Sequence, residues 1–174
     1  MTRVLASTVL LLTLFVVAPV PHAQVSPSAA SDLVALLGAN GLTRDSNGDA
    51  IADAVAARVI VPAAPALEDS LAAANIAARL GFETSALTLP LVVRDDQPEA
   101  RTAIVPILVG RGNSLVRASA TKNEIAVAGL KPGQGLIAVI PSPFGTGTAI
   151  VVTGGDDKGT LAAANVLAGR LPRL

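Results

Sequence analysis

An apolar run, a glycine turn and a helix close this chain, and they constrain its fold more than any other segment. Residues 149–153 form the apolar run, and Gly154-Gly155 leads toward a helix that we predict over residues 160–171. Apolar residues recur at helical spacing in this stretch: Leu161, Ala164, Leu167 and Leu171. Such a helix packs back on the strand before it, so the pattern indicates helices layered on a sheet.

An earlier segment has the same organisation. A strand is predicted over residues 55–61, and a helix over residues 68–79 follows, with acidic residues in its first turn and a glycine after its end. The next strand is predicted over residues 87–94, which completes a strand–helix–strand crossover between parallel strands. The helix is expected to bury one apolar face, made of Leu67, Leu71, Ala74 and Ala78, with Leu80 completing the contact near its end.

Two further strands complete the expected sheet. Residues 104–109 form a nearly continuous apolar run, which is typical of a strand covered on both faces. Residues 136–140 and 149–153 lie close enough along the chain for an antiparallel hairpin. Pro106 and Pro90 each remove a backbone donor, so at least one of their strands is expected at a sheet edge or with a bulge.

These segments predict an α/β fold, in which a single layered domain contains a mixed sheet of about five to six strands and two main helices. The domain is expected to cover residues 31–174. Aromatic residues make up only 2% of the chain while hydrophobic residues make up 51%. The core must therefore consist of small aliphatic side chains, which let helices approach a sheet closely.

Residues 1–23 have the features of an export signal. Arg3 supplies a positive charge, residues 9–17 are almost wholly apolar, and Ala23 marks the expected cleavage site. Residues 24–30 then form a flexible lead. The apolar run is too short for a comfortable membrane span, and no cysteine follows it to carry a lipid. We therefore expect a secreted or periplasmic protein that is not attached to a membrane after cleavage.

Removal of the signal also removes His22 and Met1, the only histidine and methionine of the chain. The remaining chain then contains no His, Cys, Trp, Tyr or Met, which excludes Ser-His-Asp and Cys-His catalysis, zinc held by His or Cys, and disulfides. The chain has 13 basic and 13 acidic residues, so it lacks the positive charge that nucleic acid requires. Phe82 and Phe144 are too few aromatic residues to stack on bases or sugars.

Residues 45–53 form an Asp-rich loop with the ligand spacing of a calcium site. Side-chain oxygen donors occupy positions one, three, five and nine, and position seven offers a backbone carbonyl; in order along the chain the candidate ligands are Asp45, Asn47, Asp49, Ile51 and Asp53. Two residues depart from an EF-hand loop, because Ala50 replaces its glycine and Ala56 its glutamate. The alternative is a solvated turn in which these side chains bond to their own backbone.

Two other groups of residues are candidate sites. Asp95 and Asp96 form an acidic cluster that is either a pair for general acid–base catalysis or a solvated surface. Arg111 follows the strand predicted over 104–109, at the end where α/β sheets often bind ligands. It is therefore either an anion-binding residue or part of a plain loop that precedes a short helix over residues 113–118.

Several motifs carry a resemblance to known proteins: Ala78-Arg79-Leu80-Gly81-Phe82-Glu83-Thr84, Leu89-Pro90-Leu91 and Ile150-Val151-Val152-Thr153-Gly154-Gly155-Asp156. With these motifs the chain resembles amino-terminal accessory regions of exported bacterial hydrolase and carboxypeptidase-type precursors. It is also similar to the non-catalytic α/β domains that precede glycosidase barrels. The Asp-rich loop resembles the calcium loops of dockerins and thrombospondin type 3 repeats. The resemblance implies an accessory role beside a catalytic domain.

Two classes of function follow from these observations. The first is a secreted, non-catalytic accessory or interaction domain that contacts another protein or an enzyme domain, with calcium as a stabilising ligand. It predicts an exposed apolar patch. The alternative is a small carboxylate-dependent hydrolase that uses Asp95, Asp96 and Asp157, or a fragment of a larger exported hydrolase. That alternative predicts a carboxylate of raised pKa in a closed pocket.

Overall fold

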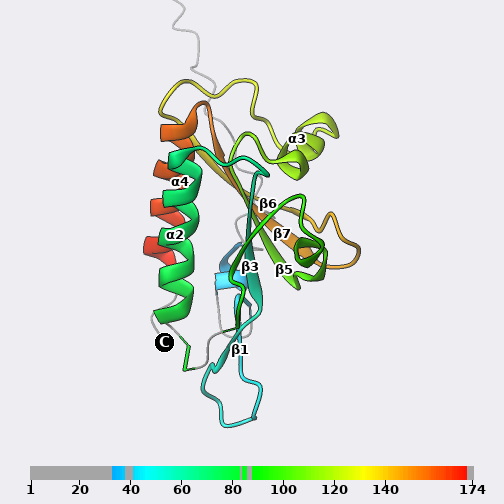
Figure 1. Cartoon of the computed structure of the whole chain (residues 1–174), viewed down its shortest axis with the longest axis vertical. Coiled ribbons are helices and arrows are strands. Elements are labelled where there is room, and N and C mark those ends of the chain that lie inside the picture. The colour runs from blue at the N-terminus through cyan, green and yellow to red at the C-terminus, as the bar shows by residue number, and fades with distance from the viewer. Residues whose placement is uncertain (1–32, 38–40, 83, 86–87, 172–174) are drawn as a thin grey trace, which may run out of the picture.

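The computed structural model describes residues 33–37, 41–82, 84–85 and 88–171, so the expected signal and lead lie outside the described residues. Figure 1 shows a central sheet with two long helices on one side and a shorter helix with loops on the other. The described chain thus has a single layered α/β arrangement with a mixed sheet. This confirms the predicted fold class.

Five strands form the main sheet, in the order β4-β3-β5-β7-β6. Their bounds along the chain are β3 (Ala57–Val61), β4 (Val92–Arg94), β5 (Val105–Val109), β6 (Gly135–Pro141) and β7 (Thr148–Gly154). All neighbours are parallel except β6, which is antiparallel to β7. The predicted hairpin and the predicted parallel crossover are therefore confirmed. A separate two-stranded ladder joins β1 (Thr43–Arg44) to β2 (Ala54–Val55) at the base of the Asp-rich loop.

The main helices are α2 (Leu67–Phe82) and α4 (Asp157–Arg170), while α3 (Ser114–Thr121) is shorter. A 3-10 helix, η1 (Pro98–Thr102), precedes β5, and residues 33–37 are helical. Helix α4 begins before residue 160 because Asp156 caps it, accepting a hydrogen bond of 2.7 Å from the Gly159 amide. No helix in the described part of the chain is long and apolar enough to cross a membrane.

Alternate residues of the central strands enter two different apolar cores, one on each face of the sheet. Strand residues that meet α2 and α4 include Val59, Val61, Ile107, Val109, Ile150 and Val152. Those on the α3 face include Ile60, Leu108 and Val151, and they pack with Val116 and Ile125. The sheet is therefore covered on both faces, as the unbroken apolar runs indicate, but by two helices on one face and thinner cover on the other.

The buried face of α2 differs from the one that the sequence predicts. Leu67 is 70% exposed and Leu71 is 44% exposed, and Ala74 and Ala78 are exposed as well. The helix instead buries the neighbouring stripe, which contains Ala72, Ala73 and Ile76, together with Leu80, whose burial the sequence predicts. Both stripes have helical spacing, so periodicity does not separate them. The buried stripe places small alanines where α2 contacts the sheet and α4, and these side chains permit close approach.

The two prolines are placed as strand pairing requires. Pro90 precedes β4, which starts at Val92 rather than at the predicted residue 87 and forms one edge of the sheet. Pro106 lies in the central strand β5, but pairing with β7 begins only at Ile107. At Pro106, β5 is therefore paired with β3 alone, and the backbone N–H that proline lacks costs little stability there. The opposite edge of the sheet is β6, whose seven residues carry no charge.

Close backbone packing joins the start of β6 to the first turn of α4. The amide of Gly155 donates a hydrogen bond of 2.9 Å to the carbonyl of Gln134. A Cβ atom on Gly159 would overlap that same carbonyl group. Gly169 lies in the same helix with no atom near the position that a Cβ would take. Packing therefore requires glycine at position 159, whereas position 169 has room for a side chain.

We predict opposite effects of alanine at these two positions. Gly159→Ala lowers the free energy of unfolding by about 1–3 kcal/mol, because the methyl group forces β6 away from α4. Gly169→Ala raises it by about 0.5–1 kcal/mol, because alanine favours a helix over glycine. Urea unfolding followed by far-UV circular dichroism measures both. A Gly159→Ala variant as stable as the parent would contradict the packing described for β6 and α4.

Candidate functional site

A cavity of about 390 Å³ opens at the carboxyl end of β7, on the α3 face of the sheet. Thr153, Gly154 and Gly155 line it from the strand and the turn that follows. Its walls come from α3 and from the segment between α3 and β6, and they include Val116, Arg117, Ala120, Val127, Ala128 and Leu130. The hollow lies on the face of the sheet with the thinner cover.

Asn113 fixes the helix that forms one wall. Its side-chain oxygen accepts a hydrogen bond of 2.9 Å from the Leu115 amide and so caps α3. Its amide nitrogen donates to the carbonyl of Ile60 at 2.9 Å and to that of Val109 at 3.4 Å. One fully buried side chain therefore ties the helix to the ends of β3 and β5.

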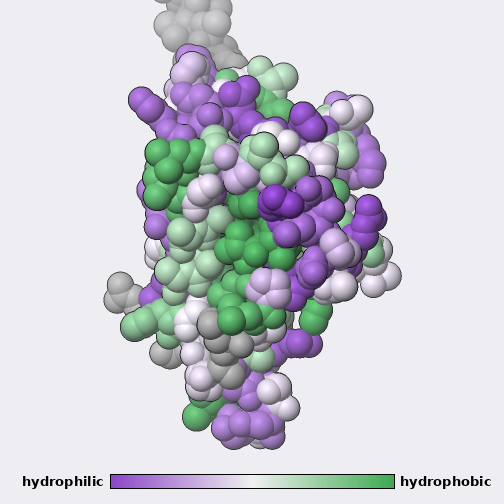
Figure 2. All heavy atoms as spheres, in the orientation of Figure 1, coloured by the Kyte–Doolittle hydropathy of each residue, from purple (hydrophilic) through white to green (hydrophobic). Residues whose placement is uncertain are grey.

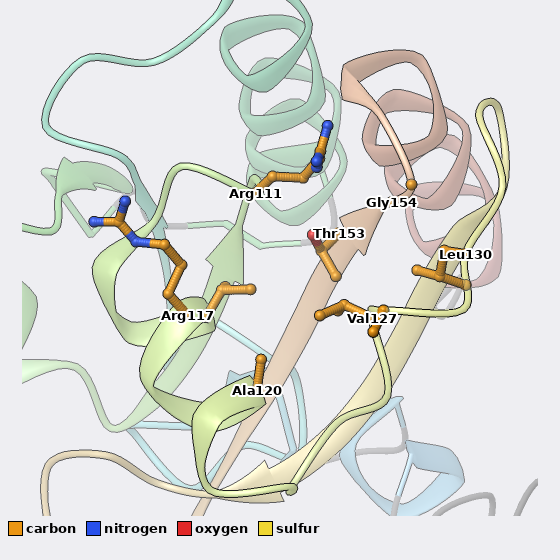
Figure 3. A pocket seen from close by; sticks show the side chains of 10 residues that line it. Arg111, Arg117, Ala120, Val127, Leu130, Thr153 and Gly154 are labelled. Atoms are coloured by element: carbon orange, nitrogen blue, oxygen red, sulfur yellow. The ribbon is translucent and has the colours of Figure 1, made fainter.

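Arg111 and Arg117 bring positive charge to the rim of this cavity, and no carboxylate is among its lining residues. Figure 3 shows Thr153 between the two arginines on one side and Val127 and Leu130 on the other. The hydroxyl oxygen of Thr153 is on the arginine side. Thr153 is 1% exposed, and its hydroxyl has no hydrogen-bond partner. The cavity thus combines an unpartnered hydroxyl and apolar walls with two arginines at its rim, whose guanidinium groups point away from Thr153 in this view.

The structure separates the predicted site residues. Arg111 lines the cavity, whereas Asp95 and Asp96 do not. Asp95 accepts a hydrogen bond of 2.6 Å from the Ser114 amide, so it places negative charge at the start of α3. Asp96 forms an exposed ion pair of 3.2 Å with Arg94. In this arrangement the acidic cluster holds a helix end and a surface arginine.

Thr153 and Arg117 were not identified from the sequence. Thr153 is the one polar residue of the predicted strand 149–153, and it stands directly before two glycines. A polar side chain at the carboxyl end of a buried strand is a signal of a site in an α/β sheet. Arg117 gives no such signal, because its place beside Thr153 depends on how α3 returns over the sheet.

One carboxylate stands close to the cavity. Asp156 accepts hydrogen bonds from the amides of Gly133 and Gly159, at 2.9 and 2.7 Å. These bonds hold the pKa of Asp156 below its ordinary value, and the charges of Lys158 and Arg111 lower it further. Asp156 is therefore committed to the α4 cap and to the loop before β6.

Asp69 is a buried carboxylate at the same end of the sheet. It is 3% exposed, its Oδ2 accepts a hydrogen bond of 3.2 Å from the Ala66 amide, and its Oδ1 has no partner. Gly110 lies against it, since a Cβ there would be 2.6 Å from Oδ1. Burial raises the pKa of Asp69, and the charges of Asp157 and Glu68 raise it further. Asp69 does not line the cavity.

The Asp-rich loop forms a network of bonds from its own side chains to its backbone. Asp45 accepts hydrogen bonds from the amides of Asn47, Gly48 and Ala50, at 2.6 to 3.1 Å. These bonds lower the pKa of Asp45. Asp49 accepts from the Ile51 amide at 2.8 Å. The loop thus has the self-bonded turns that the solvated-turn alternative describes.

Two further observations bear on calcium. Ala50 has a φ of 67°, so it takes the left-handed conformation that glycine normally supplies at position six. Asp53 accepts hydrogen bonds of 2.8 Å from the amide and the hydroxyl of Ser46. Among the described residues, no three or more His, Cys, Asp or Glu side chains lie close enough together to hold a metal ion. Calcium binding would therefore require the carboxylates of this loop to come closer together.

Comparison with known proteins adds no family to this description. No protein-family model matches the chain, and no curated protein matches it. The resemblance to accessory regions of exported hydrolases therefore stays a prediction, which rests on the sequence motifs alone.

We predict that Asp69 lowers stability at neutral pH. Its folded-state pKa is raised, so the folded protein takes up a proton before the unfolded chain as pH falls. Asp69→Asn, which keeps an acceptor for the Ala66 amide, should raise the urea midpoint at about pH 7, and its advantage should shrink toward about pH 4. Asp96→Asn is the exposed control and should change little. A lower midpoint for Asp69→Asn at neutral pH would show that the charge is stabilising.

Proposed function

We propose that this chain is a secreted, non-catalytic binding domain that holds a small ligand in the cavity beside β7. The ligand carries an anionic group, most simply a carboxylate, on an apolar body. The observation that carries the proposal is the unpartnered hydroxyl of Thr153 next to Arg111 and Arg117. The role agrees with the accessory function that the sequence resemblance implies.

The polar groups of the cavity support an anion. Guanidinium groups donate to carboxylates through two parallel hydrogen bonds, and they remain charged at every physiological pH. A buried hydroxyl without a partner is costly, and a ligand oxygen would satisfy it once a small shift of the cavity wall uncovers the Thr153 oxygen, which is buried in this structure. No carboxylate is among the residues that line the cavity, although the nearby Asp156 feels the charge of Arg111. Asp156 is already held by two backbone amides and a helix end.

The remaining walls support an apolar ligand body. Val116, Ala120, Val127 and Leu130 contribute aliphatic surface to the lining. The volume of about 390 Å³ falls within the range of small-molecule sites, which combine apolar walls with a few convergent polar groups. A bare phosphate or sulfate would leave these walls uncovered, so a carboxylate with a short hydrocarbon chain fits better.

The hydrolase alternative has one observation in its favour, which is the raised pKa of Asp69. A general acid or base must reach its substrate, however, and Asp69 is 3% exposed and absent from the cavity lining. Asp95 and Asp96 are exposed or bonded elsewhere. A binding role therefore accounts for more of the site than a hydrolytic role.

Calcium at the Asp-rich loop is a second part of the proposal. The left-handed conformation of Ala50 gives the loop the turn that calcium loops have at position six. Asp45, Asn47 and Asp49 already lie in one compact turn. The bound ion would hold Asp53 against this turn and so join the two ends of the loop beside β1 and β2.

The prediction for the cavity concerns Thr153→Val, which keeps the side-chain shape and removes the hydroxyl. It should raise the free energy of unfolding by about 1 kcal/mol, because a buried polar group without a partner disappears. The same change should weaken the binding of hexanoate about fivefold or more, because the ligand loses a hydrogen bond. A variant that is more stable than the parent but binds hexanoate more weakly identifies Thr153 as a binding residue. A purely structural residue would not separate the two effects.

Binding is measured by titrating the protein with hexanoate and following the amide signals of residues 153–155 by NMR. Arg117→Gln should weaken hexanoate binding about tenfold, whereas Arg101→Gln, an exposed arginine outside the cavity, should have no effect. Acetate tests the apolar walls and should bind more weakly than hexanoate. Equal binding of hexanoate by the parent and Arg117→Gln would reject the cavity as its site.

The calcium prediction is tested by thermal unfolding in chelator and in excess calcium. Calcium should raise the midpoint of the parent, because a ligand that prefers the folded state stabilises it. Asp49→Ala should lose this rise, while Asp96→Ala, which removes an exposed carboxylate elsewhere, should keep it. The same midpoint in both solutions would leave residues 45–53 as a polar turn.

A further inference from the structure

The outward face of α2 is apolar and uncharged. Every exposed residue of this helix is neutral, and the series runs Leu67, Ser70, Leu71, Ala74, Asn75, Ala78 and Phe82. Leu67, Leu71 and Phe82 are 70%, 44% and 80% exposed. A helix on the surface of a soluble domain normally carries charged residues on its solvent side. We call the stripe of Leu67, Leu71, Ala74, Ala78 and Phe82 the α2 face.

The α2 face continues onto its neighbour. Helix α4 lies alongside α2, and the two are joined by a hydrogen bond of 2.7 Å from Asn75 to Asn165. Val166 of α4 is 50% exposed, and Ala162 is exposed beside it. Figure 2 shows much of the side over these helices in green and pale colours, while purple gathers on the opposite flank and at the Asp-rich loop.

We infer that the α2 face is a docking surface for a second copy of this chain, with the two α2 helices packed antiparallel about a two-fold axis near Ala74. The stripe has the four- and three-residue spacing of a helix–helix seam, through Leu67, Leu71, Ala74 and Ala78. Identical faces paired in this way make an isologous, closed interface.

The distribution of charge along α2 favours this occupant. Glu68 lies in the first turn and Arg79 in the last turn, both half-buried at the sides of the stripe. In an antiparallel pair, Glu68 of one copy lies beside Arg79 of the other, and the helix dipoles also oppose each other favourably. In a parallel pair Glu68 of one copy would lie about three helical turns from Arg79 of the other, too far for an ion pair. The antiparallel arrangement is thus the one in which the charges complement each other.

The distribution of side-chain size favours the same arrangement. Leucines occupy the first half of the stripe, and alanines followed by Phe82 occupy the second half, so antiparallel pairing sets Leu71 against Ala78 and Leu67 against Phe82. An open hollow of about 450 Å³ lies there, between Ala78 and Phe82 on α2 and Ala168 on α4. The guanidinium of Arg79 lies 5.5 Å from the centre of the Phe82 ring and holds the ring beside this hollow. Leu67 of the second copy would fill it.

The inference is tested by sedimentation equilibrium of the purified protein from roughly 5 to 500 µM. The average mass of the parent should rise from one chain toward two. Ala74→Glu, on an exposed helix position, should stay at one chain over the whole range, since two like charges then meet at the axis. Ala118→Glu, on the exposed side of α3, is the matched control and should behave as the parent.

A mixture provides the decisive measurement. Ala74→Glu and Ala74→Lys should each remain single chains, while their equal mixture should again reach two chains because opposite charges meet at the axis. Circular dichroism establishes that each variant is folded. A parent protein that stays at one chain at every concentration would overturn the inference and leave the α2 face to a different protein. A dimer that Ala74→Glu does not weaken would overturn it too.

Discussion

Direct backbone contact between the start of β6 and the first turn of α4 is the constraint on which the carboxyl end of this sheet depends. Gly155 donates to the Gln134 carbonyl, and Gly159 has no room for a side chain against it. This contact fixes the turn after β7, and the turn supplies Gly154 and Gly155 to the cavity. Asp156, at the same turn, holds both the α4 cap and the loop before β6. The position of the turn that lines the cavity therefore depends on packing that involves neither Arg111 nor Arg117.

Unequal cover of the two sheet faces explains where the remaining features lie. Two long helices fill one face, and their small buried alanines leave larger leucines pointing outward. On the other face the eight-residue α3 leaves the end of β7 incompletely covered, and the cavity lies there. Asn113 is central to this arrangement, because it anchors α3 to β3 and β5 from a fully buried position.

Much of the fold follows from local pattern. Unbroken apolar runs predict β5 and β7, the short connection predicts the β6–β7 hairpin, and residues 55–94 predict the parallel crossover. The orientation of α2 could not be predicted, because two apolar stripes of equal spacing compete and only contact with α4 decides between them. Of the cavity, Arg111 follows from its position after a buried strand. The surroundings of Arg117 and Asp69 depend on contacts between segments far apart in the chain. The spacing of apolar residues does not predict such contacts.

The outer edge of β6 has a consequence for handling the protein. Its seven residues, Gly135–Pro141, include no charge, and among the described residues the strand pairs only with β7. Edge strands usually carry lysine, an inward charge or a bulge that prevents another strand from adding to them. Here proline stands only at the last position. Partial unfolding that bares this strand would expose a template for intermolecular β-pairing, so irreversible aggregation on heating is expected to begin at β6.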